Sequence, residues 1–282
     1  MEKLTVMGGV ALDYLSKVKD ASAKVTQVLE YSENLGGMAY NTAMTTAQLG
    51  INTSLVSAVG ADVPKMGKTK NLEFALNKTK GNTTRSFLFF DGKEERIYFY
   101  RGVYHEIDVA KAKVAIAKSK WVHFAGVAPC FSELVKAAVK GKKTISTNLG
   151  YDLFHYDPKD KLITDLVNNS DYLILSSKEL EYLKRPPEKL SKKACIITMG
   201  RWGSLLFEGN KRAKIPAYYV QVKSPFGAGD TYSGTLIACL MKGMKLADAA
   251  RRASAAGSFA VEEKSTTPKL SWGKIEKRAA LL

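Results

Sequence analysis

The sequence predicts an α/β fold with a mostly parallel central sheet and a second, smaller sheet. Short segments rich in β-branched residues alternate with longer helical patterns along most of the chain, and several of these segments are apolar on both faces. Strands that are buried on both faces and alternate with helices indicate βαβ units around a parallel sheet. Further extended segments lie outside this alternation and suggest a small sheet of their own.

The alternating elements follow one another along the chain. The expected strands are apolar runs bounded by turn residues, at 4–8, 53–60, 121–128, 143–150, 171–177, 194–200 and 204–209. The expected helices lie between them or after them, at 42–50, 133–141, 161–169, 178–185, 231–243 and 248–263. Several of these helices end at a glycine, which is a common C-terminal cap because glycine adopts the left-handed conformation without strain.

The segments outside the alternation are expected to form a small β-sheet lid. Residues 84–101 read as two strands joined by a loop that opens with Asp91-Gly92, a hairpin signal. Residues 10–18 and 25–33 also read as strands, with no helix between them. We expect this sheet to lie across the mouth of the main sheet, as a lid or a dimer surface. The alternative is a peripheral extension with no role.

Length and composition are typical of a globular protein. The chain has 282 residues, of which 45% are hydrophobic and 25% charged, and we expect a single α/β domain over 1–282. No apolar stretch approaches the roughly 20 residues that are needed to cross a bilayer. The first residues lack the pattern of a signal peptide, and the three cysteines are widely spaced, so we expect a cytoplasmic location without a membrane partner.

The formal net charge of +16 raises the question of nucleic-acid binding. Lys and Arg are scattered along the whole chain, and no known nucleic-acid-binding motif accompanies them. The pattern therefore argues against a nucleic-acid partner and favours a solvated surface that attracts anionic ligands such as nucleotides. A basic RNA-binding protein is the non-enzyme alternative, and it would bind RNA with a steep dependence on salt.

The sharpest local signal for chemistry is the segment 224–231, which leads into a helical run. Pro225 restricts the backbone before the turn, while Gly227 and Gly229 permit a tight turn. The resulting helix N-terminus presents free N–H groups that can converge on an anion. Asp230 lies in the first turn, where a carboxylate can accept a proton from a substrate hydroxyl during phosphoryl transfer. The alternative is an ordinary aspartate cap on a glycine-bearing turn.

Other phosphate-binding templates do not fit this chain. A Walker A loop fails at residues 67–69, because Asp62 occupies the position of the first glycine. The dinucleotide-binding fingerprint fails because Tyr232 stands at the last glycine position after Gly227 and Gly229. The signatures of protein kinases are absent as well.

Three motifs, far apart in the chain, carry a family resemblance. They are GGMAYN from Gly36 to Asn41, TMGRWG from Thr198 to Gly203, and GAGD from Gly227 to Asp230. In this order they resemble motifs of the ribokinase-like (PfkB) carbohydrate and nucleoside kinases, and the similarity covers essentially the whole chain. The resemblance implies a ribokinase-like three-layer sandwich with a mostly parallel central sheet and a small β-sheet lid. It also implies transfer of the γ-phosphate of ATP to a small molecule.

The resemblance further implies roles for individual residues on the acceptor side. These are Asp230 as catalytic base, Gly227, Ala228 and Gly229 as an anion hole, and Asp13, Gly37 and Asn41 as ligands of the acceptor. From the residues alone, simpler interpretations stay open. Asp13 would then only cap a turn, and Asn41 would only cap its helix.

On the nucleotide side the resemblance implies contacts at Ser176, Thr198, Gly200, Gly203 and Ala256. Small residues around Ala256 would flank adenine in a kinase of this family. The simpler alternative for Ala256 is that it allows two helices to pack closely.

Two departures from the family pattern concern the expected ions. The opening Asp-Thr of the family's D-T-x-G-A-G-D signature is replaced by Ser224-Pro225, which puts activation by a monovalent cation in question. In the family's N-x-x-E motif Ser176 replaces the asparagine, whereas Glu179 is retained and would act on magnesium indirectly, through water. We expect Mg²⁺ to be required, because the phosphates of ATP have to be bridged during transfer.

The acceptor is indicated less directly than the reaction. The lid-like strands are rich in aromatic residues that can stack a nucleobase or pack a dimeric lid core. The chain is also similar to archaeal nucleoside kinases of the family, so the first hypothesis is a nucleoside phosphorylated at its 5′-hydroxyl, in a homodimer formed through the lid. The run from Tyr98 to Arg101 instead resembles the segment with which acid-sugar kinases hold a carboxylate. A sugar or sugar-acid kinase, such as a ribokinase or a 2-keto-3-deoxygluconate kinase, is therefore the alternative, and Arg101 is a candidate acceptor ligand.

Overall fold

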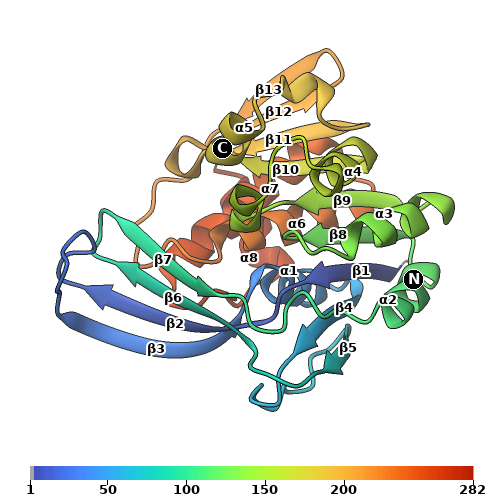
Figure 1. Ribbon diagram of the computed structural model, residues 1–282. Coiled ribbons are helices and arrows are strands. Elements are labelled where there is room, and N and C mark those ends of the chain that lie inside the picture. Colours follow the sequence, from blue (N-terminus) through green and yellow to red (C-terminus); the bar gives the residue numbers. More distant parts are fainter. Residues whose placement is uncertain (1–2, 282) are drawn as a thin grey trace.

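The main sheet is the framework of the fold (Figure 1). The computed structural model describes residues 3–281, and within them a nine-stranded sheet has the order β13-β12-β11-β10-β9-β8-β1-β4-β5. Strands from β11 to β5 run parallel, and β12 and β13 add an antiparallel edge. The strands are β1 (Lys3–Gly8), β4 (Asn52–Val59), β5 (Leu72–Lys78), β8 (Trp121–Ala125), β9 (Thr144–Asn148), β10 (Tyr172–Ser176), β11 (Ala194–Thr198), β12 (Ser204–Glu208) and β13 (Lys211–Ile215).

Helices cover both faces of this sheet, which gives three layers. Val122 and Phe124 of β8 pack with α2, α3, α4 and α5, whereas Trp121 and Ala125 of the same strand belong to the cluster of α1, α6, α7 and α8. Alternate residues of a strand point to opposite faces, so the two helical layers lie on opposite sides. The helices are α1 (Met38–Gln48), α2 (Val109–Ala117), α3 (Phe131–Lys140), α4 (Lys161–Asn169), α5 (Ser177–Leu183), α6 (Ala228–Met241), α7 (Leu246–Glu262) and α8 (Trp272–Ala279).

A separate small sheet projects from one side of the main body (Figure 1). Its order is β3-β2-β6-β7, formed by β2 (Ala11–Val18), β3 (Val28–Gly36), β6 (Thr84–Phe90) and β7 (Glu95–Tyr100). The strands β2 and β6 pair in parallel, and β3 and β7 are antiparallel to their neighbours. The prediction of a mostly parallel main sheet with a second, small sheet is therefore confirmed.

A hydrophobic contact packs the small sheet onto the main body. Leu15 of β2 and Leu88 of β6 form a buried cluster with Phe226, which lies in the loop just before α6. Partly buried Phe90 and Ile97 pack around them. The contact joins the small sheet to the segment that the sequence singles out as an anion-binding loop, so the two parts of the molecule meet beside that loop.

The sequence analysis did not predict some peripheral elements of the fold. The strands β5 (LEFALNK) and β13 (KRAKI) occupy the two edges of the main sheet and carry charged side chains. Edge strands of this kind lack the continuous apolar run of inner strands, because charges there discourage pairing with other chains. The helices α2 and α8 are short, with nine and eight residues, and give only a weak periodic signal.

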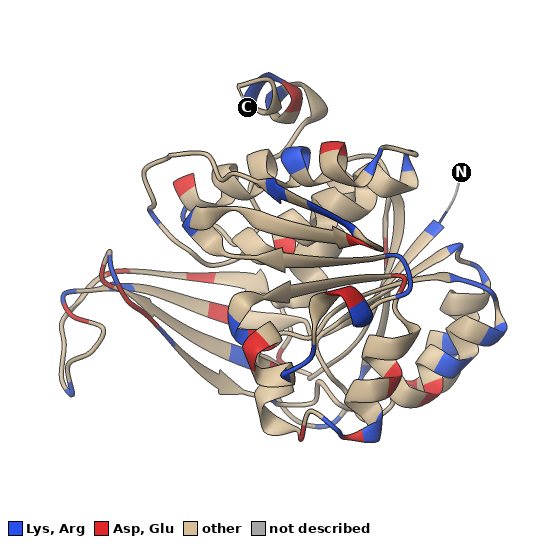
Figure 2. Cartoon of the chain, turned by 90° about the horizontal axis from the view of Figure 1, so that it is seen from above, with Lys and Arg blue, Asp and Glu red and all other residues tan. Residues whose placement is uncertain are grey.

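Charged residues are distributed over the whole chain rather than gathered on one element. Figure 2 shows Lys and Arg on many helices, strands and loops, with Asp and Glu interspersed. This distribution agrees with a solvated surface more than with a continuous basic groove. None of the helices within residues 3–281 is long and apolar enough to cross a membrane.

Candidate active site

The candidate site lies where the parallel strands end and two helices begin. In open α/β sheets, ligands bind beyond the carboxyl ends of strands at the point where the strand order reverses. Here the reversal is at β1, which has β4 on one side and β8 on the other. The helices α1 and α6 cross closely at Gly234, where an added Cβ would lie 2.8 Å from the Thr45 Cβ and 2.9 Å from the Thr42 carbonyl oxygen. This close packing brings the start of α1 against the start of α6.

Asp230 and Asn41 meet at this crossing. The Asn41 amide Nδ2 donates a hydrogen bond of 2.8 Å to Oδ2 of Asp230. Burial raises the pKa of Asp230 to about 7, the hydrogen bond from Asn41 lowers it, and the nearby charge of Asp13 raises it further. A carboxylate whose pKa lies near neutrality is suited to general-base catalysis, because it is ionised at working pH and still holds a proton well.

The loop before Asp230 has the geometry of an anion-binding turn. Gly227 has a φ of 81°, and an added Cβ there would lie 2.4 Å from the Thr266 carbonyl oxygen, so only glycine fits. Gly229 differs, because an added Cβ would meet nothing within 4 Å. Its surface therefore faces open space, as an anion cradle at a helix N-terminus requires. Ser233 and Asn148 support the loop: the Ser233 hydroxyl donates to the Gly229 carbonyl at 2.9 Å and accepts from Asn148 at 3.2 Å.

Asp13 lies on β2 of the small sheet and is 3% exposed. Its Oδ1 has no hydrogen-bond partner among residues 3–281. One carboxylate oxygen of Asp13 is therefore free to accept a hydrogen bond in the site. Burial raises the pKa of Asp13 to about 6, while hydrogen bonds from Ser86 and the Gly37 backbone lower it. Gly36 makes room for this carboxylate, since an added Cβ there would lie 1.7 Å from Oδ2.

Gly37 closes the acceptor side of the site against the first strand. It caps α1 with a φ of 93°, and an added Cβ would lie 2.6 Å from the Gly9 carbonyl oxygen. The structure thus brings together Asp13 of β2, Gly37 and Asn41 at the start of α1, and Asp230 of α6. The simpler interpretation of Asn41 as a helix cap does not hold, because its amide donates to Asp230 and it stands inside α1.

The residues expected to contact the nucleotide end the neighbouring strands β10 and β11. Ser176 and Thr198 are paired in register at the carboxyl ends of these strands. Gly200 and Gly203 follow in a short 3-10 helix, Gly200–Trp202, and its cap. Both have positive φ, of 54° and 87°. An added Cβ at Gly203 would lie 2.0 Å from the Ile215 carbonyl oxygen, whereas Gly200 faces open space.

Ala256 does not lie at the surface of this site. It is 0% exposed and belongs to the hydrophobic core between α7 and the sheet. The burial of Ala256 does not fit direct contact with a nucleotide. It fits the simpler alternative, in which Ala256 allows close packing. The neighbouring Gly257 is the small residue of α7 that faces the loop, 3.5 Å from the Ala228 carbonyl oxygen when a Cβ is added.

Both carboxylate oxygens of Glu179 accept hydrogen bonds from backbone N–H groups. Its Oε1 accepts from the Gly150 N–H and its Oε2 from the Ser176 N–H, both at 2.6 Å, and the Ser176 hydroxyl completes a capping box. Burial raises the pKa of Glu179 and these hydrogen bonds oppose the rise. Glu179 therefore does not fit as a direct magnesium ligand. Within residues 3–281 no group of three or more His, Cys, Asp or Glu side chains is arranged to hold a metal ion.

Arg101 directly follows β7 and lies near an acid that the sequence analysis did not predict. Its guanidinium Nη2 lies 3.7 Å from Oδ1 of Asp152, in the short 3-10 helix Tyr151–His155 that follows β9. Burial raises the pKa of Asp152 to about 6, and Arg101 lowers it. No motif or spacing marks Asp152, because its partner stands far away in the sequence. The pairing means that Arg101 does not present an isolated positive charge.

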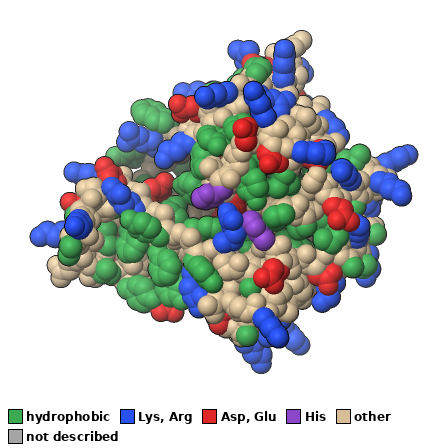
Figure 3. Space-filling model, viewed as in Figure 1, with side chains coloured by type: hydrophobic (Ala, Val, Ile, Leu, Met, Phe, Trp, Pro, Cys, Tyr) green, Lys and Arg blue, Asp and Glu red, His purple; other side chains and the backbone are tan. Residues whose placement is uncertain are grey.

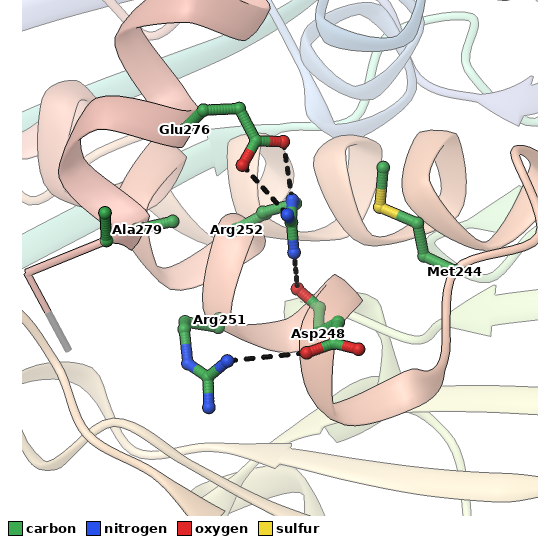
Figure 4. A pocket seen from close by; sticks show the side chains of 7 residues that line it. Met244, Asp248, Arg251, Arg252, Glu276 and Ala279 are labelled. Carbon is green, nitrogen blue, oxygen red and sulfur yellow. Dashed lines mark hydrogen bonds and ion pairs between the residues drawn. The ribbon is translucent and has the colours of Figure 1, made fainter.

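A pocket of about 440 Å³ lies elsewhere, between α7 and α8 (Figure 4). Arg252 donates to the two oxygens of Glu276 at 2.7 and 2.8 Å, and Arg251 reaches Asp248 at 3.4 Å. Asp248, Arg251 and Arg252 belong to the first turns of α7 and Glu276 to α8, whereas Gly257 near the other end of α7 faces the anion-binding loop. The pocket is therefore distinct from the candidate active site, and its arginines are paired with acids.

Comparison with known proteins agrees with this architecture. Residues 1–272 match the model of the pfkB family of carbohydrate kinases, and the chain belongs to that family. It is thus a kinase that transfers phosphate to a hydroxyl group of a small molecule.

The similar proteins include two nucleoside kinases. The chain is 28% identical to a nucleoside kinase of Methanocaldococcus jannaschii, over 99% of this chain and 97% of the relative. It is also 28% identical to a nucleoside kinase of Methanothermobacter thermautotrophicus, over 93% of this chain and 90% of the relative. The crystal structure of the M. jannaschii nucleoside kinase, an archaeal member of the ribokinase family, superposes with a TM-score of 0.79 at 25% identity, covering 100% of this chain and 99% of that one.

Proposed function

We propose that this protein is an ATP-dependent nucleoside kinase that phosphorylates the 5′-hydroxyl of its acceptor. The observation that carries the proposal is the meeting of Asp230, Asn41 and Asp13 at the mouth of a glycine loop that suits an anion. The names of the two archaeal relatives favour a nucleoside over a sugar as acceptor.

The proposed mechanism assigns one task to each group. Asp13 accepts hydrogen bonds from ribose hydroxyls through its unpartnered Oδ1, and Gly37 lets the ribose approach the backbone. Asp230 takes the proton of the 5′-hydroxyl as the hydroxyl oxygen attacks the γ-phosphorus, while the bond from this phosphorus to the β,γ-bridging oxygen breaks and ADP leaves. The N–H groups of Gly227, Ala228 and Gly229 stabilise the charge that develops on the transferred phosphoryl group.

Asn41 tunes the proposed base and holds it in place. Its amide donates to the ionised form of Asp230 and favours that form, which is the one able to accept a proton. The small sheet closes over the acceptor and excludes water, which would otherwise take the phosphoryl group.

For the donor side we propose that ATP lies along Ser176, Thr198, Gly200 and Gly203, at the ends of β10 and β11. Gly200, with open space beside it, is the most accessible of these residues to a nucleotide. Magnesium would enter with ATP, held by phosphate oxygens and water, with Glu179 acting on it only indirectly through water, and would neutralise phosphate charge when bound.

We also propose that residues 1–282 act as one unit in the cytoplasm, as a homodimer through the small sheet. The three cysteines, Cys130, Cys195 and Cys239, are free, which suits a reducing compartment. Hydrophobic side chains gather over the small sheet on the face that Figure 3 shows. In the same sheet Tyr31, Tyr98 and Phe99 are 57%, 60% and 44% exposed, with Tyr98 and Phe99 on opposite faces. Exposed apolar patches of this kind favour association.

The test of the proposed function is an ADP-release assay with ATP and a panel of acceptors. The panel contains purine and pyrimidine nucleosides, ribose, fructose and 2-keto-3-deoxygluconate. We expect ADP release with at least one nucleoside and formation of its 5′-monophosphate. Activity with a sugar or sugar acid and none with nucleosides would overturn the nucleoside assignment while leaving the kinase assignment intact.

The proposed role of Asp13 is tested by comparing the KM of the acceptor with the KM of ATP. Asp13→Ala should raise the KM of the acceptor by at least about tenfold, because a buried acceptor for ribose hydroxyls is lost, and should change the KM of ATP little. Glu181→Gln, which changes an exposed residue of α5, serves as the control and should change neither constant. An equal rise in both constants for Asp13→Ala would count against the assignment.

A further inference from the structure

Beside the proposed ribose site lies a second group of polar atoms that the mechanism does not use. The buried Arg101 Nε, Tyr104 hydroxyl, His105 Nε2 and Asp152 Oδ1 have no hydrogen-bond partner in the described part of the chain. Buried polar groups in folded proteins are almost always hydrogen-bonded, since leaving them unpaired is costly. Asp152 Oδ1 has an ion pair with Arg101 at 3.7 Å but no hydrogen bond, and the other three atoms also lack a hydrogen-bond partner, so the group points to a ligand that completes it.

The polar ends of Tyr104 and Asp152 lie close together, and Arg101 and His105 are their neighbours. A Cβ built on Gly126, just beyond the end of β8, would lie 2.6 Å from the Tyr104 hydroxyl and 3.1 Å from Oδ2 of Asp152. Arg101 lies 3.7 Å from Asp152, and the rings of Tyr104 and His105 are 4.9 Å apart. Figure 3 shows histidine side chains around a hollow between the small sheet and the main body, with a basic and an acidic side chain between them.

The group is adjacent to the proposed active site. The Tyr104 ring lies 3.5 Å from a Cβ built on Gly9, and the Gly9 carbonyl lies 2.6 Å from a Cβ built on Gly37. The turn at Gly9 thus lies next to both the four residues and the proposed ribose site. The active site also affects Tyr151, which precedes Asp152. Burial raises the pKa of Tyr151 to about 12, and the charge of Asp230 raises this pKa further.

We propose that Arg101, Tyr104, His105 and Asp152 recognise the base of the nucleoside acceptor. Asp152 accepts a hydrogen bond from an N–H at the outer edge of the base, while Arg101 and Tyr104 donate to its carbonyl oxygen or ring nitrogen. The inference rests on the proposed nucleoside kinase function and adds the groups that read the acceptor. It assigns specificity to residues that lie outside the three sequence motifs.

The charges of this group explain why a neutral base fits it better than a sugar acid. Arg101 alone would attract a carboxylate, but the Asp152 side chain lies beside it and is only 10% exposed, so a second carboxylate would be repelled. A base with both an N–H and an acceptor satisfies both partners and leaves the ion pair neutral. Every common nucleobase offers such an edge, whereas purine riboside and 2-pyrimidinone riboside lack the base N–H.

The experiment compares the best natural nucleoside with its analogue that lacks the base N–H, using the full chain. Wild type should prefer the natural nucleoside in kcat/KM by at least about tenfold, because the analogue leaves Asp152 unpaired. Asp152→Ala should lower kcat/KM for the natural nucleoside by about 10–100-fold and change that for the analogue by less than about threefold. Asp152→Asn, which keeps an acceptor oxygen, should retain most of the preference.

Each outcome decides the inference. An equal loss for both substrates in Asp152→Ala, with unchanged melting temperature, would overturn it, because Asp152 would then act on the fold of the site and not on the base. Phosphorylation of 2-keto-3-deoxygluconate by wild type, lost in Arg101→Ala, would overturn it in favour of carboxylate binding. Failure of wild type on every nucleoside would overturn the proposed function itself, and Glu181→Gln should behave as wild type throughout.

Discussion

At the scale of single residues, the site is a group of carboxylates held away from water. Burial raises the pKa of Asp13 and Asp152 to about 6 and that of Asp230 to about 7. Only Asp230 combines such a pKa with a place in the first turn of α6, beside the glycine loop. The surroundings thus distinguish the proposed base from acids of the same chemical type.

The first prediction concerns how Asn41 sets the pH range of activity. Asn41→Ala removes the hydrogen bond that lowers the pKa of Asp230, so this pKa should rise. Since the ionised carboxylate is the active form, the fall in kcat/KM on the acid side should move to higher pH. The variant should therefore lose more activity at pH 6 than at pH 8.5.

A pH–rate profile of kcat/KM for the acceptor checks this prediction. Asn168→Ala on α4, which removes a surface amide that accepts from Arg185, serves as the control and should keep the wild-type profile. A uniform loss of activity for Asn41→Ala, with the acid limb at its original pH, would mean that Asn41 positions Asp230 without tuning its charge.

Some of these residues could be predicted from the sequence and others could not. Gly227 and Asp230 are recognisable because the chemistry of a helix N-terminus depends on neighbours in the chain. Tyr104 and Asp152 belong to the candidate base-recognition group only because the fold joins β7, β8 and β9, and no spacing records that contact. The sequence analysis assigned Ala256 to the nucleotide site, although a small residue can also allow two elements to pack closely. Only the burial of its side chain distinguishes these two roles.

At the scale of elements, two close contacts shape the site. Gly234 lets α1 and α6 cross within reach of the Asn41–Asp230 hydrogen bond, and Phe226 fastens the small sheet to the loop before α6. The loop is thus held from both sides, so its N–H groups are fixed before a ligand arrives. Such preorganisation is what makes electrostatic stabilisation effective.

The second prediction tests whether a phosphate approaches this loop. Gly229→Ala places a methyl group in open space, so the fold should be kept and α6 stabilised by about 0.5–1 kcal/mol. Turnover with ATP should nevertheless fall at least about tenfold, since the methyl group displaces the transferred phosphoryl group. Thermal melting and the ADP-release assay measure the two effects.

Gly273→Ala in α8 is the matched control for this variant, because an added Cβ there also meets nothing within 4 Å. It should leave turnover unchanged. Wild-type turnover in Gly229→Ala would mean that the anion binds elsewhere.

Elements differ in how far the sequence predicts them. The inner strands and the long helices were predicted, because their apolar patterns extend over whole elements. The parallel pairing of β2 with β6 was beyond prediction, since α1, β4 and β5 separate the two strands in the chain and no local pattern marks the pairing. The edge strands β5 and β13 lacked an apolar pattern because one side of each faces solvent.

At the scale of the whole molecule, the proposed active site should lower the stability of the fold. A carboxyl group whose folded pKa is raised binds its proton more tightly in the folded state. Stability therefore increases as pH falls from about 7 toward 4, and the ionised Asp230 destabilises the fold above that range.

The third prediction follows from this linkage. Asp230→Asn removes the buried charge while keeping an acceptor for the Asn41 amide, so its melting temperature should exceed that of wild type at pH 8. The difference should shrink at pH 5, where Asp230 is protonated. Calorimetry at the two pH values measures it, and a variant less stable than wild type at pH 8 would contradict the burial of a charged Asp230.

The turnover of Asp230→Asn tests the central claim most directly, because it removes the proposed base and leaves the anion-binding loop in place. The account predicts that kcat falls at least about 100-fold, the range expected for loss of a general base. The dissociation constant of ATP should stay within about twofold of wild type, and the melting temperature should not fall. A variant that binds ATP normally and keeps kcat within a few-fold of wild type would contradict the account.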